Sequence, residues 1–251
     1  MSFKLMDVNL VDQATITSST ENALFPLNNI KDTRRSKVFR STTNSDSIVL
    51  DLQETSEIDT VFIVADKRSG FGVSTVTIEF NGTDSWGSPA FSVSVPFSVS
   101  FGIGYTEFTK INYRFARIVM TSTLGYCELS KVYIGKKLEL VRSINFGWSQ
   151  KDEELSQKQF NRYGQMFTDV IARQRAITFT MQNMDKNDLA LVNSCIDRVG
   201  ETKPLWFIIG CSEMIDDNRR ISGPYILNDI PTIVNAYFNK YSLTMNTREL
   251  M

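Results

Sequence analysis

Apolar and polar side chains alternate along several short stretches of the chain, which is the pattern of a β-strand with one face in a core. Residues 48–52 alternate in this way, and residues 76–80 do so again before Asn81-Gly82, a strong turn signal. Residues 58–65 are apolar and β-branched almost throughout, which predicts a buried strand. Many short strands separated by turns are typical of a β-sandwich or barrel, so we predict a mainly β fold.

The stretch 113–120 lies at the centre of this pattern. Its apolar residues fall on both sides of an extended chain, so we expect a strand that is covered on both faces. Arg117 would then place its charge close to apolar neighbours. Because an unpaired buried charge is costly, we expect Arg117 to have a partner.

The order of these pieces resembles a discoidin domain, the coagulation factor type C or galactose-binding-like jelly roll. The resemblance covers about residues 15–135 and predicts a jelly-roll β-sandwich in a first domain, residues 1–137. The matching pieces are a loop at 22–30, the segments 37–41 and 128–135, and strands at 48–52, 58–64, 76–80 and 115–118.

In the discoidin family, loops at one end of the sandwich often bind glycans or membrane lipids. The resemblance places these loops at 20–31, 40–47 and 66–73, and the last contains Lys67, Arg68 and Phe71. A cation beside an exposed aromatic ring can stack on a sugar, so these three residues are candidate ligand-binding residues. The alternative is that Phe71 caps the sandwich core and the two cations are solvated.

The second half of the chain contains the best helix pattern, at residues 185–199. Leu189, Val192, Ile196 and Val199 repeat at the helical period, which predicts one buried face. Asp185 suits the N-cap position, and Gly200 suits the end of the helix. Cys195 on this helix is expected in the core, because the chain has no histidine to activate it.

A domain of strands, one helix and more strands at 138–251 resembles phage tail and baseplate proteins, whose tail-tube-like fold is a β-sandwich or split barrel with one flanking helix. The resemblance implies a homo-oligomer, with a ring as its form, and other virion tail or baseplate proteins as partners. It also implies a virion location after assembly in the host cytoplasm. The charged run 151–159 is predicted to be an exposed loop or arm. The candidate interface residues are Phe146, Trp148, Lys151, Asp152, Glu153 and Glu154.

Composition narrows the chemistry. With 27 basic and 28 acidic side chains the net charge is −1, which argues against nucleic-acid binding. Three scattered cysteines and no histidine predict no metal site, no cofactor and no nucleophile of the Ser-His or Cys-His kind. No apolar run approaches the roughly 20 residues that span a bilayer, so no membrane insertion is expected.

We therefore expect a protein that is not an enzyme and has no catalytic residues. A carboxylate-dependent hydrolase would need two acids at one site, and nothing in the sequence directs two of Asp51, Glu79 and Glu128 to the same place. The main hypothesis is a structural component of a phage tail, baseplate or neck, with possible glycan contact through the first domain. The alternative is a carbohydrate-binding or adhesion module outside any ring.

Overall fold

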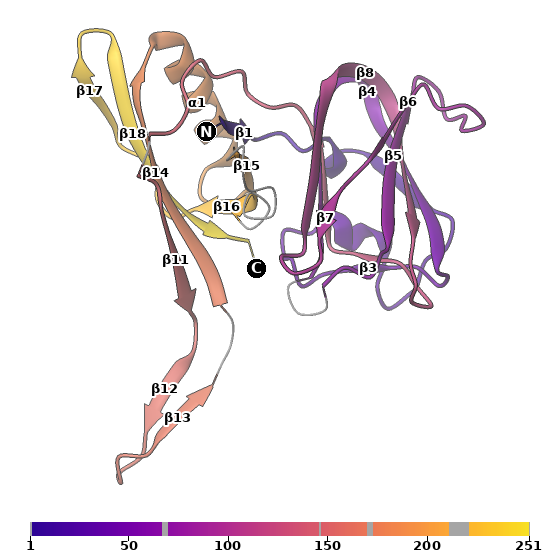
Figure 1. Ribbon diagram of the computed structural model, residues 1–251, viewed down its shortest axis with the longest axis horizontal. Helices are drawn as coiled ribbons and strands as arrows, with labels where there is room; N and C mark the ends of the chain where they lie inside the picture. Colours follow the sequence, from indigo (N-terminus) through magenta and orange to yellow (C-terminus); the bar gives the residue numbers. More distant parts are fainter. Residues whose placement is uncertain (1, 67–69, 146, 170–172, 211–220, 251) are drawn as a thin grey trace. The chain divides into compact units, whose positions relative to one another are not determined.

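The computed structural model describes residues 2–66, 70–145, 147–169, 173–210 and 221–250. The chain forms two compact units, of which the first contains Met1–Glu139 and Trp206–Gly223 and the second contains Leu140–Leu205 and Pro224–Met251. The sequence predicts a single division between residues 137 and 138, whereas in the structure the chain returns to the first unit at Trp206. The prediction of a mainly β fold is confirmed, with one α-helix in the described part of the chain (Figure 1).

The first unit is built on one curled antiparallel sheet in the order β10-β4-β8-β5-β6, with β2 added to β4 and β7 added to β8. A small second sheet pairs β3 with β9. The elements are β2 (Thr15–Ser18), β3 (Phe39–Arg40), β4 (Ser45–Val64), β5 (Thr75–Asn81), β6 (Phe91–Ser94), β7 (Phe97–Ser98), β8 (Ile103–Thr121), β9 (Glu128–Leu129) and β10 (Lys131–Gly135), with the 3-10 helices η1 (Leu10–Asp12) and η2 (Leu27–Lys31).

The two long strands β4 and β8 pair along most of their length, and their register shifts after Asp51 and after Ile58. Such irregularities bend a sheet, so that one strand pair can close around a core. The core inside contains Ile48, Ile78 and Ile118, all fully buried. Pro96 separates β6 from β7, as the sequence predicts for a residue that cannot donate a backbone hydrogen bond.

The expectation that residues 113–120 are covered on both faces is wrong. Ala116, Ile118 and Met120 are fully buried, but the residues between them on β8 are only half-buried. The Arg114 guanidinium lies 5.1 Å from the Phe115 ring centroid and covers part of this outer face. Arg117 does have the partner that the sequence predicts, because Glu79 lies 2.5 Å away.

The strand covered on both faces is the end of β4. Its outer face is covered by β1 (Ser2–Met6), which pairs antiparallel with β15 (Leu205–Gly210). The Trp206 ring lies 5.3 Å from Phe62 and 5.2 Å from Tyr133, in an apolar cluster that also contains Met6. This second cluster explains why residues 58–65 lack the alternation of polar and apolar side chains.

The second unit is a sheet in which β14 lies between β11 and β18, and β16 and β17 pair with β18. The helix α1 packs against β14 and β18. The elements are β11 (Ser149–Glu154), β12 (Gln157–Phe160), β13 (Met166–Asp169), β14 (Arg173–Met184), α1 (Lys186–Val199), β16 (Gly223–Leu227), β17 (Ile233–Tyr237) and β18 (Lys240–Glu249).

The helix α1 begins one residue after its predicted first residue, because Asp185 is the N-cap. Its carboxylate accepts hydrogen bonds from the backbone N–H groups of Asn187 and Asp188. Val192, Ile196 and Val199 are buried as predicted, and Cys195 is 1% exposed. Gly200 ends the helix with φ +55°, a conformation that favours glycine.

The charged run 151–159, which the sequence predicts to be an exposed loop or arm, is largely exposed but consists mainly of strand. Residues 151–154 belong to β11, where Lys151 pairs with Ala176 and Glu154 pairs with Arg173 of β14. An outer strand of a sheet has solvent beside it, so it accommodates charged side chains that also discourage pairing with other chains. Residues beyond β11 form a two-stranded hairpin, β12–β13, which Figure 1 shows following β11.

Candidate functional site

An arginine held between two aromatic rings is the most distinctive arrangement in the first unit. The guanidinium of Arg40 on β3 lies 4.3 Å from the Phe25 ring centroid and 4.2 Å from that of Tyr126. Its Nε and Nη2 donate to one oxygen of Glu128 on β9, at 2.9 Å and 2.5 Å. The Arg40 side chain is 28% exposed and that of Glu128 only 3%, so the cation reaches solvent while the carboxylate lies beneath it.

Backbone hydrogen bonds hold these residues together although they come from distant parts of the chain. The N–H of Asn22 donates to the Arg40 carbonyl at 3.0 Å, and the N–H of Arg40 donates to the Phe25 carbonyl at 3.1 Å. Ser41 and Cys127 fasten the other side, because the Ser41 N–H donates to the Cys127 carbonyl at 2.9 Å. The loops at 20–31 and 40–47 therefore meet at one end of the sandwich, as the discoidin resemblance implies.

The loop at 66–73 reaches the same place through Gly72. The N–H of Glu128 donates to the Gly72 carbonyl at 3.2 Å. A Cβ on residue 72 would lie 2.5 Å from the Glu128 Cβ, so only glycine permits this approach. Burial raises the pKa of the neighbouring Cys127 thiol, which keeps it protonated and unreactive.

The arrangement is suited to binding and carries no nucleophile. The guanidinium covers one face of the Phe25 ring and one face of the Tyr126 ring, so the opposite faces and the edges of the rings are the apolar surfaces that a ligand could contact, beside the N–H donors of Arg40. Because Glu128 offsets the charge of Arg40, this pair is neutral as a whole, which favours an uncharged polar ligand.

The predicted ligand-binding residues belong to the loop at 66–73, which reaches this arrangement through Gly72. Lys67 and Arg68 are outside the described residues. Phe71 is half-buried and packs against Phe97, with ring centroids 4.5 Å apart, next to the sandwich core. This packing is what the core-cap alternative describes for Phe71, while a role for Lys67, Arg68 and Phe71 in ligand binding stays a prediction.

The three carboxylates considered for hydrolysis each pair with a different arginine. Asp51 bonds to Arg114 at 2.8 Å, and Glu79 and Glu128 bond to Arg117 and Arg40. The Arg114 guanidinium holds the pKa of Asp51 below its ordinary value. Each of the three acids is therefore engaged by an arginine of its own.

The predicted interface residues lie on and near β11. Lys151, Asp152 and Glu154 are exposed, and Glu153 is half-exposed within 3.6 Å of Arg248. Trp148 is half-buried, and Phe146 lies outside the described residues. Their part in an interface stays a prediction.

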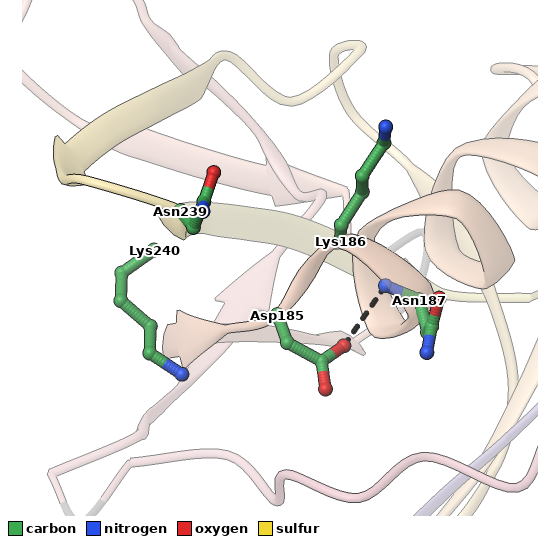
Figure 2. Close-up of a pocket in the computed structure, with 5 residues that line it drawn as sticks. All are labelled: Asp185, Lys186, Asn187, Asn239 and Lys240. Atoms are coloured by element: carbon green, nitrogen blue, oxygen red, sulfur yellow. Dashed lines mark hydrogen bonds between the residues drawn. The ribbon is translucent and has the colours of Figure 1, made fainter.

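A shallow hollow of about 450 Å³ lies in the second unit, between the start of α1 and the turn that joins β17 to β18. Figure 2 shows Asp185 turning its carboxylate toward the Asn187 N–H, 2.9 Å away, so its acid is occupied in capping the helix. The lining residues are Asp185, Lys186, Asn187, Asn239 and Lys240. We assign no ligand to this hollow, since its distinctive polar contact is structural.

Metal and membrane features are lacking in the parts of the chain that the structure covers. No group of three or more Cys, Asp or Glu side chains is placed to hold a metal ion among the described residues. Within the same residues, α1 falls short of the length and apolar character needed to cross a membrane.

Comparison with known proteins gives matches among solved structures only. No protein-family model and no curated protein matches the chain. One similar structure is CpGH89CBM32-5 of Clostridium perfringens in complex with GalNAc-β-1,3-galactose, at 10% identity and TM-score 0.44 over 51% of this chain and 100% of that one. A fucose-binding module of Streptococcus pneumoniae is 14% identical, with TM-score 0.45 over 51% of this chain and 95% of that one. The family 32 module of C. perfringens NanJ, in complex with galactose, is 9% identical, with TM-score 0.43 over 53% and 98%.

Sequence reasoning identified the converging loops but missed the cluster itself. No motif joins Phe25, Arg40 and Tyr126, because Arg40 comes 15 residues after Phe25 and Tyr126 comes 86 residues after Arg40. Only the fold brings them together. The one available hint was that Phe25 and Arg40 stand in two loops that the discoidin resemblance places at the same end, whereas Tyr126 stands outside all three predicted loops.

Proposed function

We propose that the first unit is a carbohydrate-binding module whose site is the end of the sandwich around Arg40. The observation that carries the proposal is the Arg40 guanidinium held between the Phe25 and Tyr126 rings over the buried Glu128 carboxylate. Sugar hydroxyl groups accept hydrogen bonds from a guanidinium, and the C–H face of a sugar ring packs on an aromatic ring. In this proposal the protein binds an uncharged sugar and does not cleave it.

The test is a binding titration of the full chain by calorimetry, preceded by a glycan array. Galactose, N-acetylgalactosamine and fucose are the first probes, since similar modules are described with them. Tyr126→Ala should weaken binding about fivefold or more, because a lost ring contact is worth about 1 kcal/mol or more. Arg40→Lys should also weaken binding, since lysine keeps the charge but loses the planar donor group.

Arg117→Lys is the matched control, because Arg117 also combines an acidic partner, Glu79, with an aromatic ring, Trp86, 4.9 Å away. It should leave sugar binding unchanged. An array with no bound glycan, or binding that Tyr126→Ala and Arg40→Lys leave intact, would refute the carbohydrate-binding proposal.

A second candidate function is that of a structural subunit of a phage virion, in the tail, baseplate or neck. Its support comes from the second unit, where two hairpins expose large apolar side chains, including Phe160 and Phe238. Exposed apolar patches of this kind mark surfaces that bind other proteins. In this proposal the protein assembles in the host cytoplasm, joins a homo-oligomer and docks other virion proteins.

Light scattering of the purified protein across a concentration series tests this second function. A discrete oligomer, or growth with concentration, is the expected result. A monomer at every concentration would count against it. The two functions are compatible, because different units of the chain carry them.

A further inference from the structure

The hairpin β12–β13, here called the tip hairpin (residues 157–169), exposes apolar side chains on both of its faces. Phe160 and Met166 stand opposite each other in the register, and Phe167 stands opposite Gln159. Phe160, Met166 and Phe167, together with Tyr163 in the turn, are between 55% and 72% exposed. Among the described strands, β12 pairs with β13 alone.

The turn of the tip hairpin has a defined structure. The Asn161 side chain accepts hydrogen bonds from the N–H groups of Tyr163 and Gln165, at 2.9 Å and 3.0 Å. Gly164 supplies the positive φ that the turn requires. An isolated hairpin of two four-residue strands is only marginally stable in water. Because this hairpin also exposes a large apolar surface, we expect it to bind a partner surface.

A second apolar surface lies on the hairpin formed by β17 and the start of β18. We call it the β17 surface and define it by five side chains that are between 38% and 90% exposed: Ile230, Ile233, Val234, Tyr237 and Phe238. Among the described strands, β17 pairs with β18 alone, so its other edge has no strand beside it.

The strands β11 and β17 each pair with a single described strand, and they contrast in charge. β11 carries Lys151, Asp152, Glu153 and Glu154, whereas β17 carries no charged residue. Charged side chains protect an outer strand from pairing with other chains, and an uncharged apolar one invites pairing. The β17 surface therefore has the character of a docking site.

We propose that the tip hairpin of one copy docks on the β17 surface of a second copy. At roughly 200 Å² per large side chain, each surface exposes about 500 Å² of apolar area. Their union would bury about 1,000 Å² in total, which reaches the size of a specific protein–protein interface. When this contact repeats from copy to copy, it covers both the tip hairpin and the β17 surface of every subunit. A different protein bound to one of these surfaces would leave the other surface exposed.

The contact joins two different surfaces, so it is heterologous. Heterologous contacts produce closed rings when the rotation closes and filaments when it does not. The inference rests on the second candidate function, self-assembly, and it names the surfaces through which assembly occurs.

The experiment uses two full-length variants with complementary defects. The first is Phe160→Ser with Phe167→Ser, which removes the tip hairpin's apolar surface. The second is Tyr237→Ser with Phe238→Ser, which removes the β17 surface. Sedimentation velocity gives the mass of each variant alone and of the two mixed in equal amounts, and circular dichroism verifies that each is folded.

Each variant alone should be monomeric where the wild-type protein is oligomeric, with association weakened at least about 30-fold, as for aromatic anchors of an interface. The mixture should form a dimer and stop there, because one intact hairpin meets one intact β17 surface. Leu24→Ser with Val99→Ser is the matched control, since both residues are exposed on the first unit. This control should assemble like the wild type.

Each of the following results would overturn the inference. A wild type that is monomeric throughout refutes self-assembly as well, whereas variants that still assemble refute only these two surfaces. A mixture that stays monomeric refutes the heterologous pairing. If the serine variants fail to fold, Phe160→Arg and Phe238→Arg replace them in the same mixing experiment. Phe160→Leu and Phe238→Leu are the controls for these variants, and they should keep assembly because leucine keeps the apolar contact. Loss of assembly in the leucine pair, or assembly of the arginine variants alone, would equally refute the inference.

Discussion

Lys131 is a buried lysine in the first unit whose replacement should stabilise the protein. It begins β10 and is 4% exposed, and its Nζ donates to the Asn29 carbonyl at a long 3.4 Å. Burial lowers the pKa of Lys131 from 10.5 to about 8, and the nearby carboxylates of Asp32 and Asp12 offset only part of that effect. At neutral pH the folded protein therefore holds a charge in poorly solvated surroundings.

The cost of this charge follows from the lowered pKa. A fall from 10.5 to about 8 corresponds to about 3 kcal/mol of lost stability at pH 7. Lys131→Met shortens the side chain by one atom and removes the charge, at the loss of the weak hydrogen bond to Asn29. We expect the variant to be more stable by about 2 kcal/mol at pH 7.

The pH dependence gives the sharper test. Because the folded-state pKa lies below the unfolded-state pKa, the unfolded chain binds more protons between pH 8 and pH 10.5, so wild-type stability gains from this group as pH rises. The advantage of Lys131→Met should therefore shrink from pH 7 to pH 10. Urea unfolding followed by circular dichroism gives the free energy of unfolding of both proteins at each pH. Lys37 is exposed, so Lys37→Met is the control, and its free energy of unfolding should lie within about 0.5 kcal/mol of the wild-type value. A variant less stable than wild type at pH 7, or an advantage independent of pH, would refute the reasoning.

Two further substitutions test local features of each unit. Asp185→Ala should lower the free energy of unfolding by about 1 kcal/mol, because two N–H groups at the start of α1 lose their acceptor. Asp185→Asn should keep most of the wild-type stability, because asparagine also caps a helix. Thermal unfolding followed by the helical circular dichroism signal measures both variants. Gly72→Ala should cost about 1–3 kcal/mol, since its Cβ meets Glu128, whereas Gly82→Ala meets nothing within 4 Å. An equal melting temperature for the two glycine variants would contradict the close approach at Gly72.

Features set by neighbouring residues in the chain could be predicted from the sequence. The start of α1 at Asp185 and its end at Gly200 depend on local hydrogen bonding and backbone conformation, and the break at Pro96 depends on a missing N–H. The charged run at 151–154 was misleading, because charge indicates solvent exposure but does not separate a loop from an outer strand.

Features set by distant residues could not be predicted in this way. The partners of Arg40 come from separate loops, and the layer that covers Phe62 comes from the two far ends of the first unit's sequence. Single-sequence patterns show that residues 58–65 are buried, but they do not show which strands cover them.

The pairing of β1 with β15 has a consequence for biosynthesis. Phe62 and Tyr133 leave the ribosome well before Trp206, which covers them in the finished fold. At 5–20 residues per second, the roughly 70 residues between Tyr133 and Trp206 take about 4–15 s to translate. During that interval the Phe62 and Tyr133 rings lack the Trp206 ring that covers them, so the nascent sandwich exposes apolar surface that favours aggregation until β15 emerges.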